Sequence, residues 1–448
     1  MPDGSRRPLR IVLLTDVFPP KSGGSGWSTY YLGKALTELG NSVRVVRPRF
    51  DLPVTKVTLR KQEYGGLPVD EVLIPAAPSW ASRAGLARAW QEREATGRLS
   101  ALAAHLVGRD AIDVLHGQHK VSGMAASLAV RKPVSRNTGV IAVTTVRDYW
   151  PLCPVSTRLF VDRDGKPFEC AECHRLAEYL RCVRAEKRDG VTGRALAPAR
   201  YAATYRAGRL LAAGDATIAV SGYVAKEIIR SARVPAERVV TIPNLVDLPS
   251  VDRAISASWP LPDVSPDEPF AVFVGKWDIN KGAWMLPEII QRSGVTMPVL
   301  LLGDGPLAAD IARDTAHRRL DFRFYPWLDN DAVLRVMHSA RILLFPSAWQ
   351  EPLSRVLLEG CAAGAAIVAL DTGGTSDIIV HKSSGWLAQN KDQFVEGVQA
   401  LADDDALNLM LRRGARDRAE QVFAAPKVAA EVDALYRRLL VTKGKGAL

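Results

Sequence analysis

Short apolar runs alternate with helix-type patterns along almost the whole chain, and this alternation strongly constrains the fold. The runs are near-continuous in Val, Ile and Leu, as in IVLL at residues 11–14 and VLLL at residues 299–302. Such runs are typical of strands buried on both faces of a parallel sheet. Strands that alternate with helices form doubly wound α/β units. The predicted strands are residues 9–15, 42–46, 71–74, 113–116, 139–146, 216–220, 239–242, 270–274, 299–302, 321–324, 342–345 and 365–370.

At 448 residues the chain is too long for one ordinary hydrophobic core, so two domains are expected. The alternation breaks once, in the proline-rich residues 248–269, which have little periodicity. We therefore predict a Rossmann-like domain over residues 1–247, with a cysteine-rich insertion at about 150–190. A linker over 248–269 and a second Rossmann-like domain over 270–448 follow. The two parallel sheets are expected to face each other across a cleft, with ligands at the carboxyl ends of the strands.

The composition is that of a soluble globular protein, with 47% hydrophobic and 24% charged residues. The sequence has no run of 18 apolar residues and no apolar signal-peptide segment, so a cytoplasmic location is expected. The net charge is +11, and residues 175–209 hold nine Lys or Arg against three acidic residues. This basic run is either a solvated helical face or a peripheral contact with an anionic membrane. The sequence contains no recognisable nucleic-acid-binding module, so nucleic acid is not an expected partner.

Two glutamates, Glu351 and Glu359, stand eight residues apart in the second predicted domain. Pro352 suits the first position of a helix, which would place Glu351 at the cap and Glu359 about 12 Å along the same helix. Glycosidase carboxylate pairs lie roughly 5 to 9.5 Å apart, so this pair suits two parts of one ligand better than a hydrolytic reaction. Two surface glutamates on an amphipathic helix are the alternative.

Glycines and lysines follow predicted strands of the second domain, where a diphosphate could bind. Gly373 and Gly374 are expected to open a helix whose free N–H groups bind an anion, unless they form an ordinary turn. Lys276 and Lys281 lie in a loop that could neutralise a diphosphate leaving group, although exposed lysines are usually only solvated. The glycines that allow close approach of the backbone at the end of another strand are Gly303 and Gly305.

The first domain offers a glycine loop and two histidines at predicted strand ends. Gly23 and Gly24 follow the first strand in a flexible loop that could close over a substrate. The loop does not match the G-x-G-x-x-G pattern, so a dinucleotide site is not indicated. His116 and His119 end a later strand. A lone histidine is more often structural, but two at a strand end in a predicted cleft favour a functional role.

Seven segments of the chain, which include the residues described above, resemble in their order the retaining glycosyltransferases of family 4, which have the GT-B fold of two Rossmann-like domains. The segments are TDVFPPKSGGSG, DVLHGQH, TVRDYWPLCP, IPNLVD, FVGKWDINKG, LLGDGP and PSAWQEPLSRVLLEGCAAGAAIVALDTGGTSD. The last, with its E-x7-E spacing, is the most specific, and together they cover nearly the whole chain. The resemblance implies transfer of a hexosyl group, with retention, from a GDP- or UDP-sugar to a saccharide or lipid-linked acceptor. It also implies a role in cell-envelope or exopolysaccharide synthesis.

The resemblance further implies roles for the candidate residues. By position in the motifs, the donor site comprises Glu351 at the sugar ring, Glu359 at the ribose, Lys276 and Lys281 at the diphosphate, and Gly373 and Gly374 beside it. Gly23 and Gly24 match the glycine loop near donor and acceptor, and His116 or His119 matches a histidine near the reacting sugar. The family often has His where this chain has Arg147. A catalytically impaired sugar-nucleotide-binding protein is therefore one alternative, and a nucleotide-sugar epimerase is another.

Metal sites are expected to be structural if they are present at all. Two lysines at the diphosphate leave no need for a catalytic metal. Residues 162–165 (DRDG) spell the Asp-x-Asp of metal-dependent transferases but favour a hairpin turn. Cys361 is expected in the core. A cytoplasmic protein rarely forms disulfides, so clustered thiols suggest a structural zinc site, with reduced thiols as the alternative. The clustered cysteines are Cys153, Cys170, Cys173 and Cys182.

Overall fold

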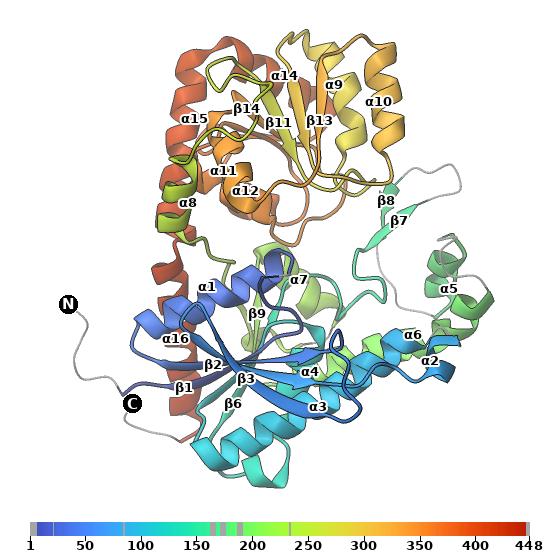
Figure 1. The fold of residues 1–448 in the computed structure, drawn as a ribbon, viewed down its shortest axis with the longest axis vertical. Helices are drawn as coiled ribbons and strands as arrows, with labels where there is room; N and C mark the ends of the chain where they lie inside the picture. The colour runs from blue at the N-terminus through green and yellow to red at the C-terminus, as the bar shows by residue number, and fades with distance from the viewer. Residues whose placement is uncertain are drawn as a thin grey trace. The chain divides into compact units, whose positions relative to one another are not determined.

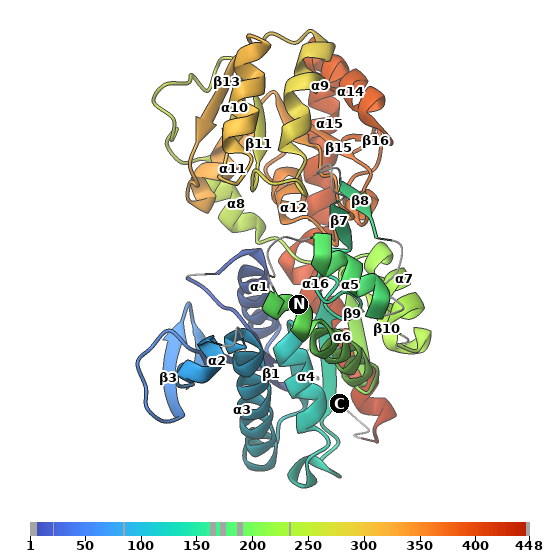
Figure 2. The ribbon, with the colours of Figure 1, turned by 90° about the vertical axis from the view of Figure 1, so that its right-hand side faces the viewer.

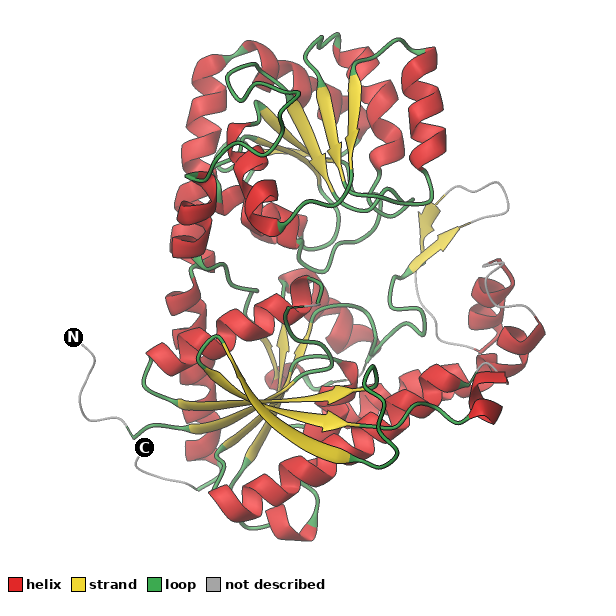
Figure 3. Cartoon of the chain, in the orientation of Figure 1, coloured by secondary structure: helices red, strands yellow, loops and turns green. Residues whose placement is uncertain are grey.

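The computed structural model describes residues 7–20, 22–83, 86–161, 167–170, 176–185, 191–232 and 234–444. The chain divides into two compact units (Figures 1 and 3). The first unit contains Met1–Arg158, Cys170–Pro243 and Ala425–Leu448, and the second contains Leu159–Glu169 and Asn244–Ala424. Each unit is built around its own mainly parallel sheet, as the alternation of strands and helices predicts.

Among the described residues of the first unit, eight strands form one sheet in the order β10-β9-β6-β5-β1-β2-β4-β3. Neighbouring strands are parallel except β3 and β4, which are antiparallel. The strand order reverses direction beside β1, and ligands of such sheets bind at the carboxyl ends of strands near this point. The strands are β1 (Arg10–Leu14), β2 (Ser42–Arg49), β3 (Thr58–Tyr64), β4 (Leu67–Leu73), β5 (Val114–Gly117), β6 (Ile141–Val146), β9 (Ala216–Ala219) and β10 (Val239–Thr241).

Helices cover both faces of the first sheet (Figures 1 and 2). Val12 and Leu14 of β1 pack with residues of α3 and α4, such as Leu99 and Ala125, in one buried cluster. Adjacent strand residues point to opposite faces, so Leu13 faces the other helix layer, where α1 lies. The helices are α1 (Gly24–Glu38), α2 (Ser79–Arg83), α3 (Ala87–Asp110), α4 (Lys120–Ala129), α5 (Leu176–Ala185), α6 (Val191–Ala212), α7 (Gly222–Ser231) and α16 (Ala425–Thr442).

The structure differs from the predicted domain limits at the C-terminus, because α16 belongs to the first unit and not to the second. Asn41 Nδ2 donates to Asp433 Oδ1 at 3.0 Å, and Tyr436 OH lies 2.6 Å from His116 Nδ1. The periodicity of this segment indicates that one helix face is buried. It carries no information on which of two sheets buries that face.

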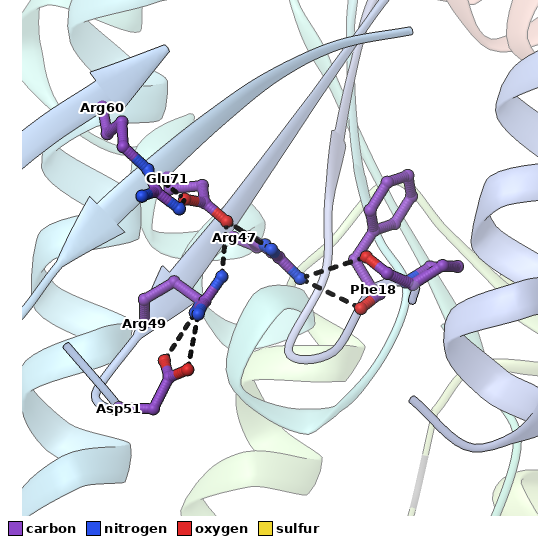
Figure 4. A network of polar contacts seen from close by, with 7 residues as sticks. Phe18, Arg47, Arg49, Asp51, Arg60 and Glu71 are labelled. Carbon is purple, nitrogen blue, oxygen red and sulfur yellow. Dashed lines mark hydrogen bonds and ion pairs between the residues drawn. The ribbon is translucent and has the colours of Figure 1, made fainter. Parts of the chain in front are cut away.

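A buried charge cluster fastens the edge of the first sheet (Figure 4). Glu71 of β4 is fully buried and accepts hydrogen bonds from Arg47 at 2.8 Å, Arg49 at 2.8 Å and Arg60 at 2.7 Å. Arg47 also donates to the carbonyl of Phe18 at 2.9 Å, in the loop after β1. A buried carboxylate is tolerated only when it is paired. The cluster therefore ties the polar edge strand β3, which the sequence did not predict, to β2, β4 and the loop that leads to Gly23.

The second unit has a six-stranded parallel sheet among its described residues, in the order β13-β12-β11-β14-β15-β16. The order reverses between β11 and β14, so the carboxyl ends of these two strands form the expected ligand-binding edge. Only β16 was not predicted. The strands are β11 (Ala271–Val274), β12 (Val299–Leu302), β13 (Phe322–Tyr325), β14 (Ile342–Phe345), β15 (Ile367–Leu370) and β16 (Trp386–Ala388).

Helices also cover the second sheet, and they include part of the predicted linker. Phe273 and Leu344 pack with Ile289 of α9 and Phe394 of α14 in one buried cluster. The predicted linker begins with α8, because its first proline stands in the first helical turn, a favoured position. The helices are α8 (Leu248–Ile255), α9 (Leu286–Ser293), α10 (Ala308–His317), α11 (Asn330–Ser339), α12 (Arg355–Ala362), α13 (Thr375–Ile378), α14 (Lys391–Asp403) and α15 (Asp405–Arg418).

Two short antiparallel strands, β7 (Leu159–Val161) and β8 (Pro167–Glu169), flank residues 162–166. The DRDG segment predicted to form a hairpin turn lies between them but outside the described residues. No helix in the described part of the chain is long and apolar enough to cross a membrane.

Candidate functional site

The carboxylate of Glu351 is the centre of a buried polar cluster at the carboxyl end of β14. The residue is 2% exposed. Lys281 Nζ donates to Glu351 Oε1 at 2.6 Å, and Ser347 Oγ donates to the same oxygen at 2.7 Å. The Lys281 ammonium also lies 5.3 Å from the centre of the Trp349 ring. The structure thus joins two residues that the sequence assigned to different parts of a donor.

The turn that carries Lys281 is held by a carboxylate that sequence reasoning missed. Asp278 Oδ1 accepts the N–H groups of Asn280 and Lys281, each at 3.1 Å. Asp and Asn commonly bond backbone groups two residues on, and this tendency could have flagged Asp278. Lys276 is placed differently from Lys281. Its side chain is 58% exposed, and its Nζ lies 3.7 Å from Asp278 Oδ2.

Gly303 and Gly305 allow the loop after β12 to lie close against the loop after β11. A Cβ added at Gly303 would lie 2.1 Å from the carbonyl oxygen of Gly275, and one added at Gly305 would lie 2.3 Å from that of Trp277. The Trp277 N–H donates to Asp304 O at 2.9 Å. Close backbone approach was predicted for these glycines, and in the structure the approaching partner is the loop after β11.

The backbone amides of Gly373 and Gly374, predicted to be free for an anion, are hydrogen-bonded in the structure. Gly373 N–H donates to Gln350 Oε1 at 2.5 Å, and Gly374 N–H donates to Glu351 O at 2.6 Å. The helix that follows, α13, is a single turn. Gly373 has φ of +59°, and an added Cβ would lie 2.3 Å from Glu351 O. The glycine pair therefore fixes the backbone around Glu351.

Glu359 lies on α12, but Glu351 does not cap that helix. The N-cap is Ser354, whose hydroxyl accepts the Leu357 N–H at 3.5 Å. The predicted separation of about 12 Å assumed a helix from Glu351 onward, so its premise is wrong. Ser354 is the better cap because its hydroxyl reaches back to the helix N–H groups. Glu359 is buried, and its Oε1 lies 2.8 Å from Arg355 Nε.

His116, predicted to lie near the reacting sugar, is a core residue in the structure. It is fully buried, with Nδ1 2.6 Å from Tyr436 OH and Nε2 2.7 Å from Thr145 Oγ1. Both ring nitrogens are occupied by hydroxyl groups of the core. Burial and then the charge of Arg147 lower the pKa of His116 to about 3.

His119, unlike His116, has a ring nitrogen that makes no hydrogen bond among the described residues. It precedes α4 at the carboxyl end of β5, and its Nδ1 lies 3.3 Å from Thr15 Oγ1. Its Nε2 is buried without a hydrogen-bond partner among the described residues. Asp16, which was not proposed as a site residue, accepts the N–H groups of Val121 at 3.0 Å and Ser122 at 2.8 Å. This carboxylate joins the loop after β1 to the start of α4 beside His119.

Gly23 and Gly24 are part of a helix start and not of a flexible loop. Gly23 is the N-cap of α1, and Gly24 is the first residue of that helix. A Cβ added at Gly23 would meet no atom within 4 Å. The loop before it is held through Phe18 by Arg47 of the charge cluster (Figure 4).

Asp148 is an acid whose pKa lies near neutrality. Burial raises its pKa to about 6, and its Oδ1 accepts the Trp150 N–H at 2.8 Å. The folded pKa exceeds the unfolded value, so stability from this group is present at low pH and is lost as pH rises through about 6.

We expect Asp148→Asn to stabilise the protein by about 2–3 kcal/mol at pH 8, because the amide carries no charge to bury. The gain should be about half as large at pH 5, because the aspartate of the folded protein is then mostly protonated while that of the unfolded chain is still ionised. Thermal unfolding of both proteins at the two pH values measures this. A variant that is less stable than the parent at pH 8 contradicts the assignment.

The predicted zinc site is not tested by the structure, because Cys173 lies outside the described residues. Among the residues that are described, no three His, Cys, Asp or Glu side chains are grouped as metal ligands. Cys361 is buried as expected, and burial raises the pKa of its thiol to about 12.

Comparison with known protein families decides the class of this chain. The model of Glycosyltransferase Family 4 matches residues 22–249, and that of Glycosyl transferases group 1 matches residues 262–418. The chain belongs to glycosyltransferase family 4. The first match contains every strand of the first sheet except β1, and the second match contains all six strands of the second sheet, so both halves of the chain match glycosyltransferase models.

Relatives of this glycosyltransferase include the O-antigen chain mannosyltransferase C of Escherichia coli, 29% identical over 39% of the chain and 48% of the relative. The chain spans about half the length of the curated relatives it matches. Anabaena Alr3699/HepE in complex with UDP has a TM-score of 0.64 at 15% identity, over 96% of this chain and 100% of that one. Sucrose-phosphate synthase from Thermosynechococcus elongatus has a TM-score of 0.64 at 18% identity, over 97% and 100%. These likenesses show the GT-B fold.

Proposed function

We propose that this family 4 enzyme moves a hexosyl group from a UDP- or GDP-sugar to a saccharide or lipid-linked acceptor, with retention of configuration. The observation that carries the proposal is the buried cluster of Glu351, Lys281 and Ser347 at the switch point of the second sheet. A carboxylate with one fixed cation suits a ligand that carries both sugar hydroxyls and phosphates. The UDP named for the HepE structure supports a nucleotide donor. The name of the O-antigen mannosyltransferase supports a role in polysaccharide synthesis.

In the proposed reaction the diphosphate leaves as the bond to the anomeric carbon breaks, and cationic groups stabilise the developing negative charge. Lys281 is positioned for this task by Asp278 and Glu351. The exposed side chain of Lys276 would swing onto the diphosphate when the donor binds. Glu351 holds hydroxyls of the donor sugar, and Glu359 on α12 binds the ribose. The acceptor hydroxyl attacks from the face that the diphosphate leaves, and its proton passes to an oxygen of the departing diphosphate.

The hydrogen bond from Gly373 to Gln350 has a consequence for donor binding. If a phosphate oxygen takes the Gly373 N–H, the carboxamide of Gln350 must turn away. Gln350 is adjacent to Glu351, so this movement would couple diphosphate binding to the loop that holds the sugar. The glycine pair thus stays in the proposed donor site, with Gln350 as the group that the phosphate replaces.

A donor-binding experiment tests the proposed site. We expect either UDP or GDP, at 100 times its Kd, to stabilise the protein by about 2.7 kcal/mol in a thermal shift experiment. Lys281→Met should abolish the shift. Lys391→Met is a matched control, because Lys391 forms a 2.7 Å ion pair with Glu288 elsewhere in the second unit. Equal shifts in all three proteins would reject Lys281 as a diphosphate ligand.

A second experiment distinguishes a transferase from an epimerase and from an impaired binding protein. The parent protein is incubated with sugar nucleotides of the base that it binds, with and without a panel of acceptors. A transferase releases nucleoside diphosphate only when acceptor is present. An epimerase converts the donor alone. Binding without turnover on any acceptor would favour the impaired protein that the replacement of the family histidine by Arg147 suggests.

A further inference from the structure

Arg147 donates hydrogen bonds to both the backbone carbonyl and the side chain of Gln118. Arg147 follows β6, and Gln118 follows β5, the adjacent strand of the same sheet. Arg147 Nη1 donates to the Gln118 carbonyl oxygen at 2.6 Å, and Nη2 donates to Gln118 Oε1 at 2.7 Å. A neutral imidazole has only one N–H donor, so a histidine at position 147 could not make both hydrogen bonds.

These two hydrogen bonds determine how the Gln118 side chain is turned. The guanidinium group has donors only, so the oxygen of the carboxamide must face Arg147. Gln118 is fully buried, and its own N–H donates to Leu14 O at 2.9 Å. Its Nε2 is left buried without a hydrogen-bond partner among the described residues. A buried orphaned donor is rare in native proteins and indicates a group that is satisfied by a ligand or by water.

The next residue, His119, presents the complementary group. Thr15 Oγ1 donates its single proton to Val17 O at 2.6 Å, so toward His119 Nδ1 it can only accept. His119 Nδ1 is therefore the protonated nitrogen, and Nε2 carries a lone pair. Burial and then the charge of Arg147 lower the pKa of His119 to about 3, which keeps the ring neutral.

We propose that Arg147 is a positioning residue, which fixes Gln118 and the turn that carries His119 so that both side chains bind hydroxyl groups of the sugar substrate. Gln118 Nε2 donates to a hydroxyl, and His119 Nε2 accepts from one. Sugar hydroxyls both donate and accept, so they match this pair of atoms. The inference rests on the proposed glycosyl transfer, and it makes Arg147 a working replacement for the family histidine instead of a loss.

The kinetic test replaces Arg147 and Gln118 singly and together. Arg147→Met should lower kcat/KM by about 10²-fold, the usual cost of a misplaced substrate, while the affinity for free nucleoside diphosphate is unchanged. Arg147→Lys should recover part of the loss. Gln118→Met should act like Arg147→Met, and the double variant should lose no more than the worse single variant, because the two residues act as one unit. Arg136→Met, at an exposed position of the same unit, is the control. Additive losses, or full activity of Arg147→Met, would overturn the proposal.

A second measurement does not depend on activity. In protein with ¹⁵N-labelled histidine, His119 should show a protonated Nδ1 and an unprotonated Nε2 from pH 5 to pH 8, and its pKa should rise in Arg147→Met. A proton on Nε2 in the parent protein would overturn the proposal, even where transfer is normal. If transfer is absent but the Nδ1 proton and the pKa rise are found, the proposed reaction fails and the positioning by Arg147 stands.

Discussion

Glu351→Gln is expected to lower sugar transfer by about 10²–10³-fold, the typical cost of removing one preorganised electrostatic group. The substitution keeps the shape of the side chain but removes the charge that fixes Lys281 and Ser347. Both groups donate to the same carboxylate oxygen. The amide of glutamine offers one neutral oxygen in its place, so the ammonium group loses its counter-charge and its fixed position.

The measurement is the rate of nucleoside diphosphate release in the presence of acceptor, together with the melting temperature. Glu396→Gln, at an exposed position of α14 in the same unit, is the matched control and should behave like the parent protein. The site assignment is wrong if Glu351→Gln transfers sugar at the parent rate while it remains folded.

Gly373→Ala is expected to have the second large effect, on both folding and donor binding. Two costs add at this position. The first is the left-handed backbone, with φ of +59°, which costs an alanine about 1–2 kcal/mol. The second is the close approach of an added Cβ to Glu351, 2.3 Å from its carbonyl oxygen and 2.6 Å from its nitrogen. Both atoms belong to backbone, so the segment that carries Glu351 must move.

Gly294 provides a matched comparison, because its φ is +68° and an added Cβ would meet no atom within 4 Å. Gly294→Ala should therefore cost only about 1–2 kcal/mol and leave donor binding intact. Gly373→Ala should cost about 3–4 kcal/mol and abolish the thermal shift by nucleotide. Urea unfolding followed by tryptophan fluorescence measures the stability cost of each variant, and the thermal shift experiment with nucleotide measures donor binding. Equal costs for the two variants would show that contact with Glu351 does not constrain Gly373.

The sheet strands were predictable where they are apolar on both faces. Runs such as residues 299–302 can be buried in only a few ways, and the structure places them in parallel sheets. The strand β3 (TLRKQEY) escaped prediction because it lies at an edge and is mostly exposed. Its pairing depends on charges that meet only in three dimensions, chiefly Arg60 with Glu71 of the neighbouring strand. The local periodicity of the sequence carries no information on such long-range ion pairs.

The candidate site was predictable as a set of loops, but the contacts within it were not. Glu351, Lys281 and Gly373 all lie at one edge of the second sheet, as strand order requires. The spacing of Glu351 and Glu359 was interpreted as one helix, whereas a hydroxyl cap starts the helix later. Hydrogen bonding distinguishes His116 from His119, because hydroxyl groups occupy both ring nitrogens of the first, whereas Nε2 of the second has no partner among the described residues. Which of the two rings finds partners follows from packing that no motif records.

The most direct test of the account is the anomeric configuration of the transferred sugar. The protein is incubated with the UDP- or GDP-sugar that it binds and with an acceptor, and the new glycosidic bond is examined by NMR. We predict that a bond forms only when acceptor is present, that it keeps the configuration of the donor, and that Glu351→Gln forms about 10²–10³-fold less of it. An inverted product, or the same product from Glu351→Gln at the parent rate, would contradict the account.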